Sequence, residues 1–341
     1  MIAGLQKVLW EIVGALLLGA AIYWLVAGRP LFLSGVAVDW SPRWLDVKTI
    51  FLSILLEAIP FVLMGVFFSA LIQTFVKEET VSRWTPKHPL LAIPFATFLG
   101  FLFPVCECAI VPVIRRLIRK GMPVYVGIVF LLSGPVVNPI VLTSTYVAFQ
   151  RQPEMAIYRG VLAAVIAALV GLLVWLFLRS RQQHVLQGDH SHRHAAADHD
   201  HAHHHHESKD DKLLATFYHA VDEFFDMGKY LLFGALVSAV LQVFIAREAL
   251  ASIGQSPFSA NLVMMGLAYV FSLCSEADAF IAASFGTTFP AQALLAFLVF
   301  GPMIDFKNTL LLLTTFRLGF VVGLIAVVSL LVMVFTLLTP L

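Results

Sequence analysis

The sequence predicts an all-α polytopic membrane protein with about nine transmembrane helices, in two internally repeated halves with proline-broken helices at the centre. Three observations indicate this class. The chain of 341 residues is 60% apolar and 13% charged. Several apolar runs reach the roughly 20 residues that cross a bilayer. Two stretches far apart in the chain have the same residues at several matching positions. This composition excludes an ordinary soluble domain.

Nine apolar runs are long enough to be candidate spans. The first precedes an aromatic and charged stretch without a small-residue cleavage site, so we interpret it as a retained helix and not as a signal peptide. The runs lie near residues 8–27, 47–76, 89–113, 123–149, 156–178, 213–246, 259–284, 290–315 and 317–339.

An internal duplication is indicated by aligning "LMGVFFSALIQTFV" (63–76) with "LFGALVSAVLQVFI" (232–245). The alternative is chance similarity between apolar helices, but matched Gly, Ser, Gln, Cys and acidic positions in one order are not expected from chance. The matched positions are Leu63 and Leu232, Gly65 and Gly234, Ser69 and Ser238, Gln73 and Gln242, Phe75 and Phe244, Glu57 and Asp226, and, with a small drift, Cys106 and Cys274.

One long polar stretch divides the chain in two. We therefore expect an extra N-terminal helix and connecting loop (1–46), a first half (47–178), a His-rich polar linker (179–212) and a second half (213–341). The sequence leaves open whether the halves run parallel or inverted, because that depends on the number of spans in each half.

Gly-Pro interrupts a span in each half, in "GPVVNP" (134–139) and "GPMIDF" (301–306). Proline removes a backbone donor, and the carbonyl groups it frees need a partner within a membrane. Repeated transporters place their substrate site at such breaks near the bilayer midplane. Asn138 and Asp305, four residues beyond each Gly, are therefore candidate substrate-binding residues, with a simple kink as the alternative.

The chain has three cysteines, Cys106, Cys108 and Cys274. Residues two apart on a regular helix point in nearly opposite directions, so the first pair can bind one ion only where the backbone is opened. Pro104 and Pro112 flank that pair and make an opening plausible. Thiolates prefer soft acceptors such as Zn(II) and Cu(I) and, by the same logic, trivalent arsenic or antimony. The alternative is three small buried apolar side chains.

Carboxylates accompany the cysteines in both halves. Glu107 separates the first pair, and Cys274 is followed by Ser-Glu-Ala-Asp, which contains Glu276 and Asp278. A charged residue inside a span costs about 2.5–3.5 kcal/mol on insertion scales and usually faces a pathway or a partner. These three carboxylates are therefore candidate substrate-binding residues.

Two further acidic residues occupy equivalent repeat positions, Glu57 and Asp226. A carboxylate in apolar surroundings can take up and release a proton during transport, so we expect them to act as a proton-coupling pair. The alternative for Asp226 is the solvated end of a span. Asp305 and Lys307 lie deeper, where pairing with each other is the simpler interpretation.

Ten of the twelve histidines fall between residues 184 and 206. Such clusters bind divalent transition metals, but the irregular spacing encodes no fixed geometry, so we expect a metal-buffering loop that is disordered without metal. An expression tag is the alternative for the final "HHHH". No cofactor is expected to be required, although zinc or another divalent metal can bind at His190, His192, His194, His199, His201, His203, His204, His205 and His206.

Three basic groups set the expected orientation, because cytoplasmic loops are enriched in Lys and Arg. Counting spans places all three on one face, which we interpret as the cytoplasmic face of the inner membrane, together with the His-rich loop. Lys and Arg in "KEETVSRWTPKH" reduce the contrast with the opposite face. The groups are Arg29, Arg43 and Lys48; Arg115, Arg116, Arg119 and Lys120; and Arg179 and Arg181.

The chain resembles the predicted-permease family of the ArsP type in the sequences of four segments. They are "FPVCECAIVPVIRRLIRKGMP", "SGPVVNP", "CSEADAF" and "FGPMIDFKNTLLL". The resemblance covers most of residues 47–316. Characterised members of that family export trivalent organoarsenicals, which implies an efflux permease whose cysteine thiols bind the substrate. The first helix and the His-rich loop look like additions to the shared core, and the loop points toward divalent metals.

Our leading hypothesis is a secondary-type permease that exports a soft metal or metalloid species across the inner membrane. The alternatives are a zinc-type divalent metal permease, and a membrane metal sensor or assembly subunit that does not transport. A net charge of +1 does not suggest nucleic acid, and no nucleotide-binding or HExxH pattern indicates an enzyme. The expected partners are the substrate and the lipid bilayer, and a homo-oligomer is left open.

Overall fold

The computed structural model describes residues 42–75, 80–81, 85–86, 88–102, 106–178, 209–244 and 256–341. The predicted helix at 8–27 and the His-rich stretch 184–206 lie outside these residues. All elements in the described part are helices: α2 (Pro42–Phe75), α4 (Pro89–Leu102), α5 (Glu107–Arg119), α6 (Val124–Ser133), α7 (Pro139–Ala148), α8 (Glu154–Leu178), α9 (Lys209–Phe244), α11 (Pro257–Phe271), α12 (Asp278–Ser284), α13 (Ala291–Met303), α14 (Phe306–Thr315) and α15 (Leu318–Leu338).

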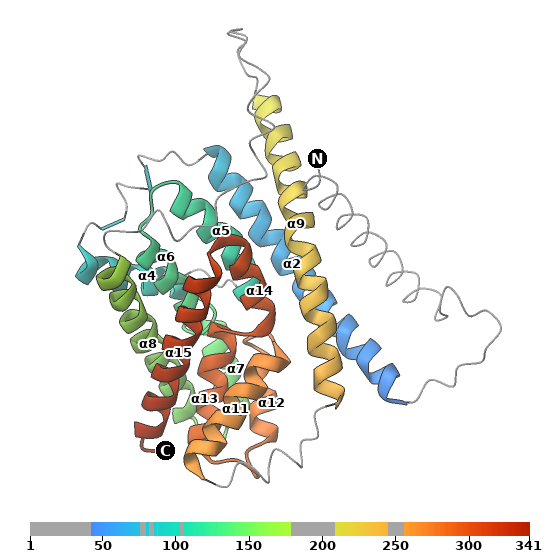
Figure 1. Ribbon diagram of the computed structural model, residues 1–341, viewed down its shortest axis with the longest axis vertical. Coiled ribbons are helices and arrows are strands. Elements are labelled where there is room, and N and C mark those ends of the chain that lie inside the picture. The colour runs from blue at the N-terminus through green and yellow to red at the C-terminus, as the bar shows by residue number, and fades with distance from the viewer. Residues whose placement is uncertain are drawn as a thin grey trace, which may run out of the picture.

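The described part of each half has the same order of long and short helices. A long helix comes first, four shorter helices follow, and another long helix ends the half. The first long helices, α2 and α9, lie side by side and run in opposite directions (Figure 1). Trp44, near the start of α2, contacts Phe244, the last residue of α9, with their ring centroids 5.8 Å apart. α2 and α9 are therefore antiparallel.

Five segments in the described part are long and apolar enough to cross a membrane: Arg43–Ile72, Glu154–Phe177, Met227–Phe244, Ala291–Thr315 and Leu318–Leu338. Four of the predicted spans are interrupted. The run 89–113 breaks between α4 and α5, 123–149 between α6 and α7, 259–284 between α11 and α12, and 290–315 between α13 and α14. Each interruption leaves short helices, so helix ends lie inside the protein.

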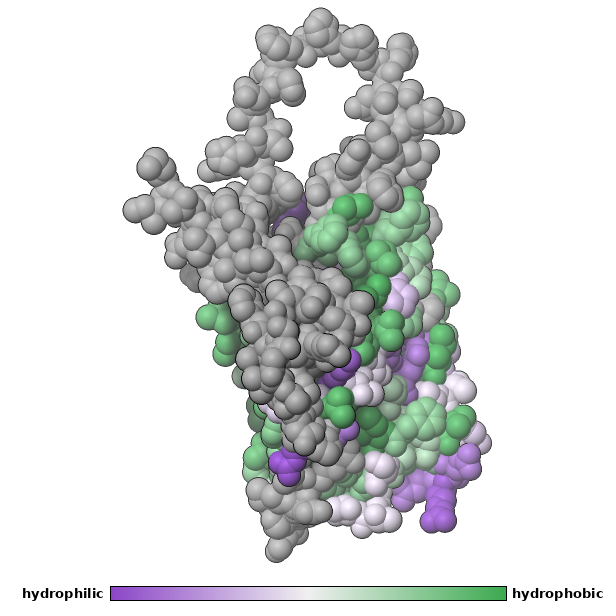
Figure 2. All heavy atoms as spheres, turned by 90° about the vertical axis from the view of Figure 1, so that its right-hand side faces the viewer, coloured by the Kyte–Doolittle hydropathy of each residue, from purple (hydrophilic) through white to green (hydrophobic). Residues whose placement is uncertain are grey.

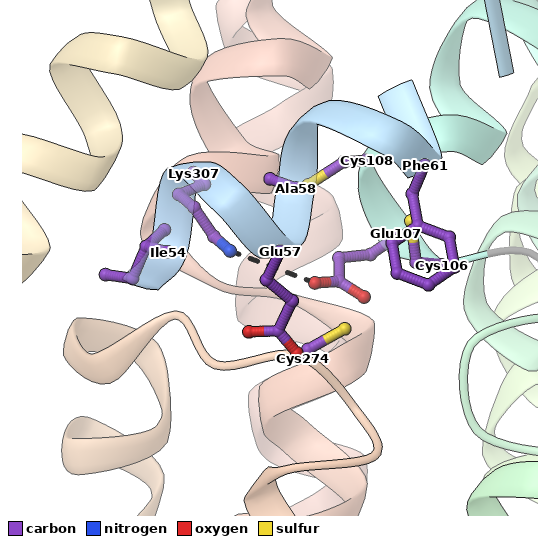
Figure 3. Close-up of a pocket in the computed structure, with 9 residues that line it drawn as sticks. All are labelled: Ile54, Glu57, Ala58, Phe61, Cys106, Glu107, Cys108, Cys274 and Lys307. Carbon is purple, nitrogen blue, oxygen red and sulfur yellow. Dashed lines mark ion pairs between the residues drawn. The ribbon is translucent and has the colours of Figure 1, made fainter. Parts of the chain in front are cut away.

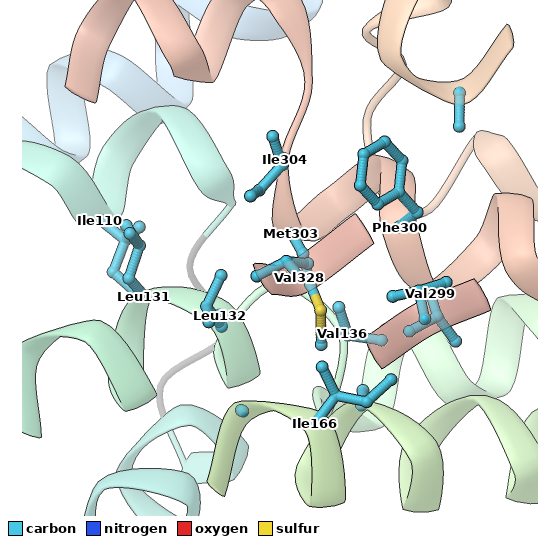
Figure 4. Close-up of a cluster of buried hydrophobic side chains, with 14 of the residues drawn as sticks. Ile110, Leu131, Leu132, Val136, Ile166, Val299, Phe300, Met303, Ile304 and Val328 are labelled. Atoms are coloured by element: carbon cyan, nitrogen blue, oxygen red, sulfur yellow. The ribbon is translucent and has the colours of Figure 1, made fainter. Parts of the chain in front are cut away.

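The interior is built from both halves. Ile110, Leu131 and Val136 of the first half lie in one buried cluster with Met303 and Val328 of the second (Figure 4). Many large apolar side chains lie instead on the outside, and hydrophobic residues cover much of the described part of the face in Figure 2. An apolar outer surface is what a bilayer requires of spanning helices.

Glycines allow two close helix contacts that position the centre. A Cβ on Gly65 of α2 would lie 2.5 Å from the backbone oxygen of Ala109 in α5, and a Cβ on Gly100 of α4 would lie 2.9 Å from Gly134. The Ser69 hydroxyl also donates to the carbonyl oxygen of Pro112 at 3.4 Å. Close approach of this kind is typical of small residues between membrane helices, and here it seats the start of α5 against α2.

The contacts of α2 with α5 correct part of the expected orientation. Gly65 lies against Ala109 and Ser69 against Pro112, so the two helices run in the same direction. Arg43, at the start of α2, therefore lies at the opposite end of the bundle from Arg119, at the end of α5. The basic groups around these residues do not share a face, because the interrupted spans turn back inside the protein and change the span count.

Candidate functional site

The start of α5 opens the backbone between the first two cysteines. Cys106 has extended dihedral angles (φ −72°, ψ 163°) and precedes the first turn, whereas Cys108 lies within that turn. Two residues on one regular helix would point nearly oppositely. Because the helix begins only at Glu107, both thiols face one cavity. The opening that the sequence required at this pair is present.

A small cavity, which we call the thiol cavity, lies where the interrupted helices meet α2 (Figure 3). About 10 Å³ of it is open to the centre of a water molecule, which is room for about one water. Both halves contribute to its walls. The lining residues are Ile54, Glu57, Ala58 and Phe61 of α2, Cys106, Glu107 and Cys108 at the start of α5, Cys274 after α11, and Lys307 of α14.

A carboxylate and an ammonium group face each other in this cavity. Lys307 Nζ lies 4.0 Å from Glu107 Oε1, and the two side chains are only 4% and 2% exposed. The other carboxylate oxygen, Glu107 Oε2, is buried with no hydrogen-bond partner among the described residues. The sequence suggested that Lys307 pairs with Asp305, but the ion pair in the structure joins Lys307 to Glu107 of the other half.

Asn138 and Asp305 occupy equivalent places outside this cavity. Each is the N-cap of the helix that follows its break: Asn138 Oδ1 accepts from the backbone N–H of Ile140 at 2.9 Å, and Asp305 Oδ1 accepts from that of Asn308 at 2.5 Å. Capping satisfies donors that a helix start leaves unpaired. Both side chains therefore stabilise the breaks without lining the cavity.

Asp278 lies in a second buried ion pair. Its Oδ2 atom is 2.8 Å from the guanidinium of Arg159, which is fully buried in α8. The same guanidinium donates to Thr145 Oγ1 at 2.7 Å and to the carbonyl oxygen of Ser275 at 3.0 Å. Sequence analysis missed Arg159, although an arginine inside an apolar run is a recognisable signal of a buried partner.

The remaining predicted residues are placed differently. Glu57 and Glu276 are both partly buried, but only Glu57 lines the thiol cavity. Asp226 belongs to α9, but its side chain lies outside the described part, as does the His-rich loop, so neither prediction is tested. Among the described side chains, no three His, Cys, Asp or Glu residues are arranged to hold a metal ion.

Comparison with known proteins places the chain in a family. Residues 43–341 match the model of a family described as "Predicted permease", ArsP_1. The chain is 46% identical over 290 residues to "UPF0718 protein YcgR" of Bacillus subtilis (strain 168), covering 85% of this chain and 95% of that protein. It is 38% identical over 301 residues to a Streptococcus mutans protein named "Putative two-component membrane permease complex subunit", covering 86% and 94%.

No solved structure matches the chain. The match over residues 43–341 and the identity of 46% over nearly the whole of a relative are sufficient to assign the family. Together with the five segments of the described part that are long and apolar enough to span a bilayer, they identify a multi-pass membrane protein. The chain belongs to the predicted permease family of the ArsP type.

Proposed function

We propose that this protein is a secondary-type permease that exports a soft metalloid species, resembling a trivalent arsenical, through the cavity between its two halves. One observation carries the proposal. All three cysteines of the chain, from positions up to 168 residues apart, are among the nine residues that line this cavity. Cysteines that serve only as small apolar side chains have no reason to gather around one cavity that also contains Glu107 and Lys307.

Thiol chemistry suits a trivalent metalloid hydroxide. When a thiol replaces hydroxide on arsenic, an As–S bond forms, an As–O bond breaks, and the thiol proton leaves with the hydroxide as water. The exchange changes no net charge. This matters in a buried cavity, because an unpaired charge in apolar surroundings is costly.

Proton release distinguishes a neutral metalloid from a divalent cation. A zinc ion binds thiols as thiolates, so each bound thiol must release its proton out of the buried cavity. In the exchange with a metalloid hydroxide, each thiol proton leaves as part of a neutral water molecule. The Lys307 ammonium, 4.0 Å from Glu107, is compatible with either substrate, because two thiolates cancel the charge of a zinc ion.

The opposite directions of α2 and α9 favour a transporter over a membrane sensor. Inverted halves with broken helices at their interface are typical of secondary transporters, in which the two halves rock around a central site. The cavity has room for about one water, so in this conformation it is closed to a larger substrate. We propose that it opens alternately to each side of the inner membrane.

Orientation and partners are also part of the proposal. We assign the end of α5 to the cytoplasmic face, supported by the four basic residues within the stretch 115–120 and by the enrichment of Lys and Arg in cytoplasmic loops. The Streptococcus relative is named as a subunit of a two-component complex. By analogy, we propose that a second membrane subunit works with this chain. Full activity of the purified chain alone would exclude that subunit as a requirement.

Uptake into inside-out vesicles tests the proposal. Vesicles that carry the chain should accumulate methylarsenite, whereas the triple variant Cys106→Ser, Cys108→Ser, Cys274→Ser should not. We expect a loss of about 100-fold or more, because even the outer partners of metal ligands contribute 10- to 100-fold to affinity. The matched control is Ser256→Ala, which removes a hydroxyl in the exposed capping box of α11.

Three outcomes decide between the hypotheses. Methylarsenite uptake that depends on the thiols supports the proposal. Thiol-dependent uptake of ⁶⁵Zn without methylarsenite uptake supports the divalent-metal permease instead. Equal transport by the wild type and a folded triple variant contradicts a thiol site, and binding without any uptake, with the partner subunit present, supports a sensor.

A further inference from the structure

A second and larger cavity opens at one end of the bundle. It encloses about 700 Å³ between the end of α7, the α7–α8 turn, α12 and the start of α13. Its lining includes Phe149, Arg151, Phe280 and Ala283; we call it the vestibule. Gln292, next in sequence to a lining residue, donates to the carbonyl oxygen of Thr339 at 3.3 Å. The vestibule therefore lies at the end of the bundle where α15 ends, away from α5 (Figure 1).

One short segment separates this vestibule from the thiol cavity. Cys274, four residues before the start of α12, lines the thiol cavity, whereas Phe280 and Ala283 of α12 line the vestibule. α12 has seven residues and therefore spans about 10 Å. The chain from Cys274 to the end of α12 therefore borders both spaces.

Arg159 of α8, in the first half of the chain, binds α12 and the residues just before it. Its guanidinium binds the Asp278 carboxylate in the first turn of α12 at 2.8 Å and the carbonyl oxygen of Ser275, next to Cys274, at 3.0 Å. A third bond to Thr145 Oγ1 at 2.7 Å fixes the guanidinium against α7. Arg159 is fully buried, so water does not compete for these bonds.

The ion pair on the α5 side is much looser. Lys307 Nζ and Glu107 Oε1 are 4.0 Å apart, beyond the length of a hydrogen bond. Each half thus receives one cation from the other half: Lys307 reaches the start of α5, and Arg159 reaches the start of α12. Only the second pair is held by short hydrogen bonds, so the contacts between the halves are tighter on the vestibule side.

We infer that α12 is the gate between the thiol cavity and the vestibule, and that Arg159 is the positioning residue that holds it closed through Asp278 and Ser275. The substrate leaves or enters on this side when α12 moves and the three bonds of Arg159 break. The inference rests on the proposed function, because it takes the thiol cavity as the transport site. It adds the route on one side and the residue that controls it.

Accessibility of Cys274 tests the gate. The full-length chain with Cys106→Ser and Cys108→Ser, in which Cys274 is the only thiol, is reconstituted in lipid nanodiscs and treated with a charged, membrane-impermeant methanethiosulfonate. Adding Arg159→Met and Asp278→Asn removes both charges together and leaves neither unpaired. We expect Cys274 to react about tenfold faster, equivalent to about 1.4 kcal/mol of easier opening.

Two controls accompany this test. Ala283→Cys in a background without the native cysteines should react rapidly with or without the Arg159 pair, because it lines the vestibule. Asn261→Ala removes another buried interhelical hydrogen bond, from Asn261 Nδ2 to Thr336 Oγ1 at 2.8 Å, and should leave the rate at Cys274 unchanged.

Unchanged reactivity of Cys274 in the double variant overturns the gate. If that variant does not fold, Arg159→Lys and Thr145→Val weaken the same contacts more gently and should each raise the rate, and no increase in either also overturns it. The readout is accessibility and not transport. A faster Cys274 reaction beside a triple cysteine variant that still transports would preserve the gate and reject the thiol site.

Discussion

Lys307 of α14 and Glu107 of α5 face each other 4.0 Å apart across the boundary between the two halves, with both side chains almost fully buried. They are separated by 200 positions in the sequence. Removing one member of a buried ion pair leaves an uncompensated charge, which costs about 3–5 kcal/mol. Their energetic coupling is therefore measurable.

The pair should show coupling in a double-mutant cycle. Lys307→Met and Glu107→Gln should each lower the free energy of unfolding by about 3 kcal/mol, toward the low end because the pair lacks a hydrogen bond. The double variant should lose clearly less than the sum. Denaturant unfolding in detergent measures the three values, and Lys229→Met, at an exposed lysine of α9, is the control. Additive losses would show that the two charges do not interact.

Gly65 should tolerate no side chain. A Cβ there would lie 2.5 Å from the backbone oxygen of Ala109, and backbone cannot move aside cheaply, so Gly65→Ala should destabilise the protein by about 1–3 kcal/mol. Gly266→Ala in α11 is the matched control, because nothing lies within 4 Å of its Cβ, and alanine favours a helix by up to about 1 kcal/mol. Thermal unfolding in detergent compares them, and equal effects would contradict the close packing of α2 on α5.

Glu57 should carry the coupling proton, with Asp226 as its predicted partner. Glu57 lines the thiol cavity, and the neutral variants Glu57→Gln and Asp226→Asn mimic a permanently protonated state. Both should bind and exchange methylarsenite but fail to accumulate it under an imposed pH gradient, because only a difference between protonation states can drive turnover. Accumulation by both variants against the gradient in inside-out vesicles would exclude this pair.

The His-rich loop should buffer metal without taking part in transport. Deleting residues 184–206 should abolish most zinc binding by the purified chain, as measured by calorimetry, and leave methylarsenite uptake unchanged. A loop of the same length with its ten histidines replaced by glutamine is the matched control and should behave in the same way. If the deletion stops uptake but the glutamine loop does not, the length of the linker is what transport requires.

Residues that stand out by their local sequence were the ones that could be selected as site candidates. The three cysteines, Glu107 and Glu57 were candidate site residues, and all five line one cavity. The opening expected at Cys106 is present, because a start of α5 at Glu107 leaves Cys106 extended. These predictions depended on local features, namely unusual polar residues in apolar runs and nearby prolines.

Residues brought together over long separations could not be predicted. Pairing of Lys307 with Asp305 was one of two alternatives, but Asp305 caps α14 and Lys307 reaches Glu107. An arginine inside an apolar run indicates a buried partner, but only the structure shows that the partner of Arg159 is Asp278, 119 positions away. The apolar runs that contain interrupted helices also resembled simple spans by composition, and this resemblance misplaced the basic groups at the two ends of the bundle.

The sequence by itself determined that this is a helical membrane protein of a permease family, because hydropathy, Gly-Pro interruptions and the Cys-Glu-Cys motif are local patterns. Only the tertiary structure decided that α2 and α9 run in opposite directions and that Cys274 meets Cys106 and Cys108 in one cavity. The physical reason is that a side chain's partner depends on helix packing. In this chain, packing is set by close contacts such as Gly65 on Ala109, which no single stretch of sequence contains.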